Sequence, residues 1–305
     1  MYDVIVIGAG PAGMTAAIYT ARKKLNTLVL AKEAGGQMVW SSDVENYTGF
    51  SMITGAELTL KFQEHMASLK EDLEVKLGSE VINLEKNITS FLVEDKAGNQ
   101  YYAKAVIIAS GKVPRHLGIP GEMEFFGKGV AVCATCDAPL YKQKDVAVVG
   151  GGNSALDAAV ALAKVGKQVY IININKALSG EIVNIEKLQK LPNVRIYNDA
   201  KITSILGDKF VTGLTFDKFG EKQSQQLSVS GVFIEIGYEP SHDFDHITEK
   251  NDKGEIKVDQ NLQTNIPGLF AAGDINDAWG EQIVIAAGEG AKAAMAVSNY
   301  LTKLI

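Results

Sequence analysis

The feature that most constrains this chain is a buried strand, a glycine turn, a helix and a second strand, which follow one another from the N-terminus. We expect the strands at residues 2–7 and 27–30, with the helix at residues 12–24 between them. Strands that alternate with helices build parallel sheets with helices on their faces. The beginning of the chain therefore predicts a dinucleotide-binding core.

The same order of elements returns in the middle of the chain. Strands at residues 145–149 and 168–172 flank a helix at residues 154–165, and glycines occupy positions 150–152. A pattern that occurs twice predicts two cores of the same kind. Further strands are expected at residues 79–84, 89–93, 105–109 and 231–236, and the last of them ends in a turn at residues 237–240.

The end of the chain decides how the two cores are connected. Residues 268–274 predict a short strand and a turn before a long terminal helix, which has little to pack on unless it returns to the first core. We therefore expect an α/β fold of two Rossmann-like three-layer dinucleotide-binding domains, with the second inserted into the first. The first domain comprises residues 1–113 and 243–305, and the second comprises residues 114–242.

The first glycine turn has the form G-x-G-x-x-G. Gly8 makes the tight turn, Gly10 lets the backbone approach a pyrophosphate, and Gly13 lets the helix pack close to the strand. The pyrophosphate then meets free N–H groups at the helix N-terminus. An acidic residue about 20 positions further on holds the ribose hydroxyls in such sites. Glu33 is in range, and a solvated loop glutamate beside Lys32 is the alternative interpretation.

The second glycine turn, at residues 150–155, fits G-x-G-x-x-A but lacks the residue that reads the nucleotide. The second strand of this core ends at Ile172, and residues 173–175 are Asn-Ile-Asn. An acidic side chain there would bind the 2′-hydroxyl of NADH, and an arginine would bind the 2′-phosphate of NADPH. Lys176 is the nearby cation.

The two cysteines of the chain, Cys133 and Cys136, form a C-x-x-C. Cysteines at this spacing can close a small disulfide ring and exchange it with the disulfide of a partner. Two buried core thiols or half of a zinc site are the alternatives, and the isolated histidines offer little to complete a zinc site. Asp137 follows directly, as a proton carrier for a thiolate or as a turn residue.

Composition excludes several classes of protein. Two cysteines cannot make a disulfide scaffold or hold an iron–sulfur cluster, so redox chemistry here needs an organic cofactor. The net charge of −6 argues against a nucleic-acid binder. Apolar runs stay well below the roughly 18 residues that span a bilayer, and the first strand leaves no room for a signal peptide. We expect a cytoplasmic protein.

The chain resembles the low-molecular-weight bacterial thioredoxin reductases over essentially its whole length. Any one of the matching motifs is weak evidence, but they occur together and in order. They are residues 8–13, Gly-Gly-Gln at 35–37, Val-Glu-Asn at 44–46, Ala-Ser-Gly at 109–111, Cys-Ala-Thr-Cys-Asp at 133–137, residues 150–155, and Ala-Ala-Gly-Asp at 271–274 with Gln282.

The resemblance implies FAD bound by the first domain, a homodimer, thioredoxin as the partner, and an acid–base role for Asp137. It also implies a second domain that rotates between two states, with hinges near residues 111–121 and 237–240. The cofactor contacts that it implies are Gly8, Gly10, Pro11, Ala12, Gly13, Glu33, Gly36, Gln37, Asn46, Val81, Ala109, Gly111, Gly273, Asp274, Gln282 and Ile283.

Two departures from the family pattern concern the electron donor. The family's His-Arg-Arg and a further Arg, which grip the NADPH phosphate, fall on residues 173–175 and on Ser179, and a family Glu falls on Asp157. Charge-assisted contacts are worth about 1.5–3 kcal/mol each, so NADPH as a donor is doubtful. The chain is most similar to the ferredoxin-dependent flavin thioredoxin reductases. An acidic ferredoxin would need a basic patch, such as residues 22–24 or Lys142 with Lys144.

Three other functions remain open. NADPH or NADH, held by backbone amides and Lys176, is the alternative donor. The flavoprotein partner of a peroxidase resembles this chain but carries an extra N-terminal thioredoxin-like region, for which we expect no space here. A flavin-bound redox sensor or dithiol oxidase would use the same cysteines without a thioredoxin.

Overall fold

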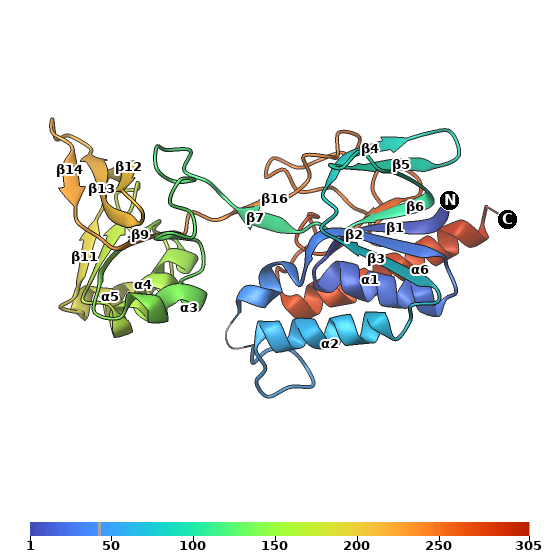
Figure 1. Ribbon diagram of the computed structural model, residues 1–305, viewed down its shortest axis with the longest axis horizontal. Helices are drawn as coiled ribbons and strands as arrows, with labels where there is room; N and C mark the ends of the chain where they lie inside the picture. The colour runs from blue at the N-terminus through green and yellow to red at the C-terminus, as the bar shows by residue number, and fades with distance from the viewer. Residues whose placement is uncertain (42–43, 305) are drawn as a thin grey trace. The chain divides into compact units, whose positions relative to one another are not determined.

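The computed structural model describes residues 1–41 and 44–304, and at residues 135 and 136 it describes the backbone alone. The chain divides into two compact units, drawn in Figure 1. The first unit comprises Met1–Val113 and Glu239–Ile305, and the second comprises Pro114–Tyr238.

A mixed sheet of seven strands forms the centre of the first unit. The strands are β1 (Tyr2–Ala9), β2 (Thr27–Ala34), β3 (Leu73–Leu77), β4 (Val81–Lys86), β5 (Phe91–Asp95), β6 (Gln100–Ile108) and β17 (Leu269–Ala271). Their order is β3-β2-β1-β6-β5-β4, and β17 pairs with β6. The pairs of β1 with β2 and β6, of β2 with β3, and of β6 with β17 are parallel, and β4 and β5 pair antiparallel.

Both faces of this sheet are buried, because its central strand is apolar at successive positions. Side chains of a strand point alternately to opposite faces. Val4 and Val6 of β1 pack into one core, and Ile5 and Ile7 pack into the other. The first core is closed by α1 (Pro11–Arg22), α2 (Gly55–Ala67) and α6 (Ile283–Thr302), as Figure 1 shows.

The chain passes between the units through two short strands, β7 (Lys112–Pro114) and β16 (Tyr238–Pro240), which pair with each other. We expected a turn at residues 237–240, so this part of the prediction is wrong. The backbone N–H of Ser241 donates to the carbonyl of Gly111 at 2.9 Å. This bond returns the chain to the first unit, and the second boundary therefore lies at 238/239 rather than at 242/243.

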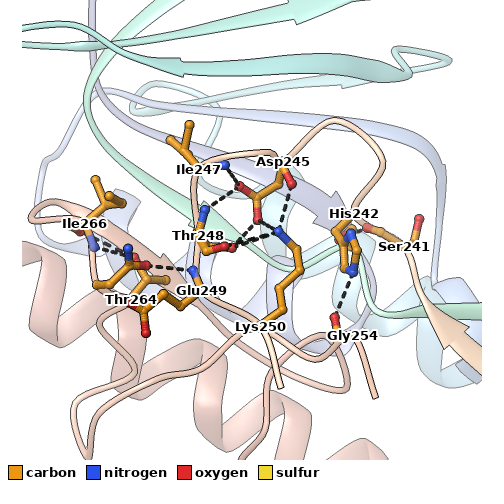
Figure 2. Close-up of polar contacts among 12 residues, drawn as sticks. Ser241, His242, Asp245, Ile247, Thr248, Glu249, Lys250, Gly254, Thr264 and Ile266 are labelled. Carbon is orange, nitrogen blue, oxygen red and sulfur yellow. Dashed lines mark hydrogen bonds and ion pairs between the residues drawn. The ribbon is translucent and has the colours of Figure 1, made fainter. Parts of the chain in front are cut away.

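Buried polar contacts fix the irregular segment between β16 and β17, as Figure 2 shows. Asp245 is 2% exposed, and its carboxylate accepts hydrogen bonds from the backbone N–H groups of Ile247 and Thr248, each at 3.2 Å, and from the Thr248 hydroxyl. The Lys250 ammonium lies 3.2 Å from the same carboxylate. A buried carboxylate that is paired and hydrogen-bonded in this way orders the chain around it.

The second unit is built on a parallel sheet in the order β11-β10-β9-β15-β8. Its strands are β8 (Val130–Ala131), β9 (Asp145–Val149), β10 (Gln168–Ile172), β11 (Val194–Tyr197) and β15 (Gly231–Ile234). An antiparallel sheet adds β12 (Ala200–Gly207), β13 (Val211–Lys218) and β14 (Gln225–Leu227). The helices are α3 (Ala134–Asp137), α4 (Asn153–Val165) and α5 (Ile182–Lys190).

These elements confirm the predicted α/β class and the two strand–glycine–helix–strand cores. β9 and β10 have the predicted bounds. β17 pairs with β6 of the first sheet, so the terminal segment returns to the first core as expected. Within residues 1–41 and 44–304, no helix combines the length and the apolar character needed to cross a bilayer.

Candidate active site

The first glycine turn contains glycines of two kinds. A Cβ added to Gly8 would lie 2.3 Å from the carbonyl oxygen of Ala109, and one added to Gly13 would lie 1.9 Å from that of Gly8. The fold itself therefore requires both of these glycines. A Cβ added to Gly10 would meet no atom of the chain within 4 Å. Gly10 leaves open space beside the turn, as a close-approaching ligand would need.

The N-terminus of α1 faces this space with unsatisfied backbone donors. Gly10 is its N-cap and offers no side-chain hydrogen bond, and Pro11 occupies the first helical turn. The first N–H groups of a helix have no partner within the helix and favour an anion. The turn and α1 therefore fit a pyrophosphate.

Two of the predicted contacts lie beside the end of β2. Ala34 pairs in register with Ala9 of β1, so Glu33 lies next to the glycine turn, with an exposed side chain. The ammonium of Lys32 lies 2.6 Å from the carboxylate of Glu80, which precedes Val81. Because Lys32 is paired with Glu80, the Glu33 carboxylate can accept hydrogen bonds from solvent or from a ribose.

The terminal segment packs directly on the start of α1. A Cβ added to Gly273 would lie 2.9 Å from the Cβ of Ala12, and one added to Gly290 would lie 2.1 Å from the Ala12 carbonyl oxygen. This close approach brings Asp274 to the glycine turn. Gln282, the N-cap of α6, accepts a hydrogen bond from Asn46 Nδ2 at 2.9 Å. Residues far apart in sequence thus meet as the family resemblance implies.

Asp274 is a half-buried carboxyl group with an altered pKa. Burial, and then the charge of Glu281, raise the pKa of Asp274 to about 6, while the nearby charge of Lys112 opposes this. Because burial leaves this carboxyl group poorly solvated, hydrogen bonds from hydroxyl donors such as those of a ribityl chain would stabilise its charged form.

Lys112 is a residue of this region that the sequence did not predict. Its side chain is 9% exposed, and its ammonium lies 2.7 Å from the carboxylates of both Glu255 and Glu281. Its carbonyl accepts from Gln37 Nε2 at 3.2 Å. Burial lowers the pKa of Lys112, but the hydrogen bonds to Glu255 and Glu281 outweigh burial and raise it. The only sequence signal for this role was the position of Lys112 directly after the Ala-Ser-Gly motif.

The residues present therefore fit FAD in the first unit. The short helix η1 (Gly36–Trp40) carries Gln37. Gly36 lies next to Gly10, because a Cβ added to Gly36 would lie 3.5 Å from the Cα of Gly10. The backbone of Ala109 is fixed by its N–H, which donates to Ile7 at 2.7 Å. Gly111 has a positive φ of 66°, and Ile283 begins α6.

The cysteine pair lies at the start of α3 in the second unit. Cys133 directly precedes this helix and is disulfide-bonded. The backbone of Cys136 lies in α3, and its side chain is outside the described residues. Asp137 donates from its backbone N–H to the Cys133 carbonyl at 3.2 Å, and burial raises the pKa of its half-buried carboxyl group. An acid is thus held one turn from the disulfide.

The second glycine turn has the backbone of the first. Gly150 has a φ of 138°, and an added Cβ would lie 2.1 Å from the carbonyl oxygen of Glu235. A Cβ added to Gly152 would meet no atom of the chain within 4 Å, and Gly152 caps α4 without a side-chain hydrogen bond. The turn itself would therefore admit a phosphate.

The end of β10 differs from the end of β2, because a buried asparagine occupies it. Asn173 is 1% exposed, and its Nδ2 donates to the carbonyl of Asn175 at 3.0 Å and to Asn198 Oδ1 at 2.8 Å. Its Oδ1 accepts from the N–H of Asn175 and lies 2.3 Å from where a Cβ of Gly151 would be. The polar groups of the Asn173 side chain are therefore bonded within the fold.

The segment after Asn173 continues across the turn. Ser179 donates from its N–H to the Gly151 carbonyl at 2.8 Å, and Glu181 donates from its N–H to Asn153 Oδ1 at 2.8 Å. Ile174 and Lys176 are exposed. In the part of the chain that is described, no three His, Cys, Asp or Glu side chains gather as a metal ion would require.

Comparison with known proteins gives a consistent family. Residues 2–290 match the family model described as pyridine nucleotide-disulphide oxidoreductase. The chain is 39% identical over 303 residues to the alkyl hydroperoxide reductase F protein of Staphylococcus epidermidis, and the match covers 99% of this chain and 59% of that protein. The chain thus spans about three fifths of the length of the curated relatives that it matches.

Solved structures of thioredoxin reductases match the whole chain. That of Lactococcus lactis, in the FR conformation, is 33% identical with a TM-score of 0.86 and covers 99% of this chain and 100% of that one. A ferredoxin-flavin thioredoxin reductase from Clostridium acetobutylicum is 31% identical with a TM-score of 0.55, and covers 99% of this chain and 98% of that one.

Proposed function

The chain belongs to the pyridine nucleotide-disulphide oxidoreductase family, and we propose that within it the protein reduces the disulfide of a thioredoxin through FAD and the Cys133–Cys136 pair. Its family and its structural relatives make it a flavin-dependent oxidoreductase that acts on sulfur groups. The observation that carries the proposal is the disulfide-bonded Cys133 at the start of α3, with the half-buried Asp137 one turn away.

FAD, bound in the first unit, would take up electrons from a donor and deliver two of them to the disulfide. The first glycine turn and the N-terminus of α1 would hold its pyrophosphate, and Glu33 its ribose. Asp274 and Gln282 would bind the ribityl chain and the flavin from the terminal segment. Glycine at position 10, where the fold does not need it, supports this assignment.

The cysteines and Asp137 would carry out the exchange with the partner. A thiolate on one cysteine attacks a sulfur of the thioredoxin disulfide and forms a mixed disulfide, which the other cysteine resolves. Asp137, whose pKa is raised by burial, gives a proton to the leaving sulfur and recovers it from the next thiol. The inserted unit would move between the flavin and the partner through β7 and β16, each preceded by a glycine with a positive φ, Gly111 and Gly237.

We further propose that reduced ferredoxin, rather than NADPH, is the electron donor. The support comes from the end of β10, where the hydrogen bonds of Asn173 are made within the fold and where the arginines of NADPH-binding relatives are replaced by exposed Ile174 and Asn175. The likeness to the ferredoxin-flavin enzyme of Clostridium acetobutylicum also supports it.

An acidic ferredoxin needs a basic surface, and the two predicted patches differ in this respect. In residues 22–24, Lys24 lies 2.6 Å from Asp72, so its charge is paired. Lys144 is exposed, and its carbonyl accepts from the backbone N–H of Lys167 at 2.9 Å. Lys144 and Lys167 line a hollow of about 440 Å³ in the second unit. The patch of Lys142, Lys144 and Lys167 is therefore the better candidate.

The test of the proposed function is turnover of thioredoxin by the purified FAD protein with a chemically reduced donor. Wild-type protein should reduce thioredoxin catalytically. Cys133→Ser and Cys136→Ser should each lose at least about a thousandfold in rate, because the exchange needs both sulfurs. A Cys136→Ser protein that still turns over would contradict the mechanism.

A second candidate partner is favoured by the similarity to the alkyl hydroperoxide reductase F protein. That protein is longer than the part matched here, so a further region would have to carry electrons on to a peroxidase. The same assay with the disulfide of an alkyl hydroperoxide reductase peroxidase in place of thioredoxin distinguishes the two. Direct turnover of that peroxidase at a rate above that of thioredoxin would favour the second candidate.

Cytoplasmic location and a homodimer stay predictions. Light scattering of the purified holoprotein tests the dimer. A redox sensor or dithiol oxidase without a thioredoxin partner is the remaining alternative, and it predicts a flavin that reacts rapidly with oxygen while thioredoxin stays oxidised.

A further inference from the structure

Lys112 lies where three segments of the first unit meet, and the proposed mechanism does not use it. Its carbonyl accepts a hydrogen bond from Gln37 Nε2 of η1 at 3.2 Å. Its ammonium lies 2.7 Å from the carboxylate of Glu255 and 2.7 Å from that of Glu281. Glu281 directly precedes Gln282, the N-cap of α6. Lys112 therefore joins η1 to the start of α6, and both of these segments carry predicted flavin contacts.

The hydrogen bonds of the two glutamines determine which group each side-chain amide offers to a cofactor. A backbone carbonyl only accepts, so Gln37 turns its NH2 group toward Lys112 and keeps its Oε1 as an acceptor. Gln282 Oε1 accepts from Asn46 Nδ2 at 2.9 Å, so Gln282 keeps its NH2 group as a donor. Within residues 1–41 and 44–304, neither of these remaining groups is bonded to the chain. An acceptor and a donor fit the N–H and C=O groups of a flavin ring.

The two carboxylates that share the Lys112 ammonium would repel each other without it. The Glu255 carboxylate also accepts from Asn251 Nδ2 at 2.7 Å, and its side chain is largely buried. The Glu281 side chain is 61% exposed, and in the described part of the chain Lys112 alone binds its carboxylate. Glu281 is therefore the partner that is free to move away when the ammonium is removed, and Gln282 would move with it.

The charges of Lys112 and Glu281 also act on Asp274, another predicted flavin contact. Burial, and then the charge of Glu281, raise the pKa of Asp274, and the charge of Lys112 opposes this. A Glu281 carboxylate without its lysine would therefore raise the proton affinity of Asp274 further and weaken Asp274 as an acceptor.

We propose that Lys112 is a positioning residue of the flavin site, whose ammonium holds the start of α6, and with it Gln282, by neutralising Glu255 and Glu281. The inference rests on the proposed function for the binding of FAD by the first unit. Lys112 acts through its neighbours, so its side chain needs no contact with the cofactor. The charge of Glu281 is useful only while Lys112 balances it, so removing that charge should have opposite effects with and without the lysine.

The experiment measures how tightly the purified holoprotein holds FAD, without thioredoxin or an electron donor. The holoprotein is diluted in steps, and the released FAD is measured by its fluorescence at equilibrium. Lys112→Met should weaken FAD binding at least about tenfold, because it leaves two neighbouring carboxylates without their cation. Lys112→Arg keeps the charge and can donate to both carboxylates, so its affinity should stay within about threefold of wild type.

Glu281→Gln separates the charge effect from a loss of packing. On its own it should weaken FAD binding about threefold, as expected for an ion pair with one exposed partner. In the Lys112→Met protein the same substitution removes the repulsion from Glu255, so it should strengthen FAD binding at least about threefold. A cavity left by Lys112 would not be repaired in this way, and additive losses in the double variant would overturn the proposal.

Glu281→Gln also covers the case in which Lys112→Met does not fold. The Glu281 side chain is exposed, so this variant should fold normally. An unchanged affinity of Glu281→Gln for FAD would overturn the proposal without any substitution at Lys112.

Lys250→Met is the matched control, because Lys250 is a largely buried lysine of the same unit. Its ammonium lies 3.2 Å from the buried carboxylate of Asp245, as Figure 2 shows, and it also contacts Thr248. Neither partner is a predicted flavin contact. Lys250→Met should lower the stability of the protein and leave the FAD affinity of the folded protein unchanged. A loss of affinity equal to that of Lys112→Met would overturn the proposal.

The results for FAD affinity are distinct from those that test the proposed function. A protein that shows the expected pattern of affinities but does not turn over thioredoxin would contradict the proposed function alone. A protein that turns over thioredoxin while all of these variants hold FAD as tightly as wild type would contradict the role of Lys112 alone.

Discussion

The two glycine turns of this protein share a backbone and differ at the end of the neighbouring strand. Gly10 and Gly152 both border open space, and both cap a helix without a side-chain hydrogen bond. At the end of β2, Glu33 is exposed, whereas at the end of β10, Asn173 is buried and bonded within the fold. The turn leaves room for a phosphate in both units, and on this account the residue at the end of the second strand decides which nucleotide binds.

This difference explains how one fold can occur twice in a chain and serve two purposes. The strand–turn–helix geometry is required for packing, as the contacts of Gly8 and Gly150 show, so it persists whether or not a nucleotide binds. Positions 174, 175 and 179, where the family pattern has arginines, lie on the surface and can be replaced without cost to the core. On this account the first unit holds a cofactor and the second holds the disulfide.

The largest change should come from restoring the missing arginines. We expect Ile174→Arg, Asn175→Arg and Ser179→Arg together to raise the affinity for NADPH by at least about a hundredfold, since charge-assisted contacts to a phosphate are worth about 1.5–3 kcal/mol each. These positions are at least partly exposed, so the core is not disturbed. Titration calorimetry measures the effect. The same positions changed to Gln are the control, and an equal gain there would contradict the charge argument.

A substitution at Lys112 tests how much its ion pairs with the C-terminal segment stabilise the first unit. Lys112→Met leaves the carboxylates of Glu255 and Glu281 unpaired, so we expect a loss of about 2 kcal/mol in the free energy of unfolding. The exposed pair of Lys96 with Glu80 is the control, and Lys96→Met should cost about 0.5 kcal/mol or less. Denaturant unfolding monitored by flavin fluorescence compares the two. Equal losses would mean that the Lys112 pairs contribute no more than surface charges.

A pair of matched substitutions compares the turns themselves. Gly10→Ala and Gly152→Ala each add a Cβ that meets no atom of the chain within 4 Å, so both proteins should fold. Gly10→Ala should weaken FAD binding by about tenfold, because the methyl group stands where the pyrophosphate approaches. Gly152→Ala should leave FAD binding and thioredoxin turnover unchanged. A Gly152→Ala protein with reduced turnover would indicate that the second turn is in use.

The smallest effect concerns the pH dependence of the apoprotein. The folded-state pKa of Asp274 is raised to about 6, so the folded state holds a proton that the unfolded state releases, and stability falls as pH rises from about 4 to about 6. Asp274→Asn should therefore stabilise the apoprotein by about 1 kcal/mol at pH 8 and have little effect at pH 4. Thermal unfolding at the two pH values checks this, and a gain at pH 4 alone would be contrary to it.

The regular parts of both units were predictable, because their patterns are local. The strands of the glycine cores and the return of β17 follow from apolar runs and from a terminal helix that needed a partner. The short strand β16 was mistaken for a turn, since its pairing with β7 joins segments more than a hundred residues apart. β3 and the sheet of β12, β13 and β14 were also not predicted.

The candidate site divides in the same way. The glycines, Asp274 and the cysteines were visible because their chemistry is tied to a motif. Lys112 was not, because a charged side chain shows its role only when its burial and its partners from elsewhere in the chain are known. The arrangement at Asn173 was predictable only in part. The sequence shows that a charged residue is missing there, but it does not show that the Asn173 side chain is hydrogen-bonded within the fold.

The central claim is that the second unit does not read NADPH, and anaerobic reduction of the bound flavin tests it most directly. The purified yellow holoprotein is mixed with NADPH, NADH or reduced ferredoxin, and the flavin absorbance is followed. We predict rapid bleaching by reduced ferredoxin and slow or incomplete bleaching by either nicotinamide. Rapid and complete bleaching by micromolar NADPH would contradict the account.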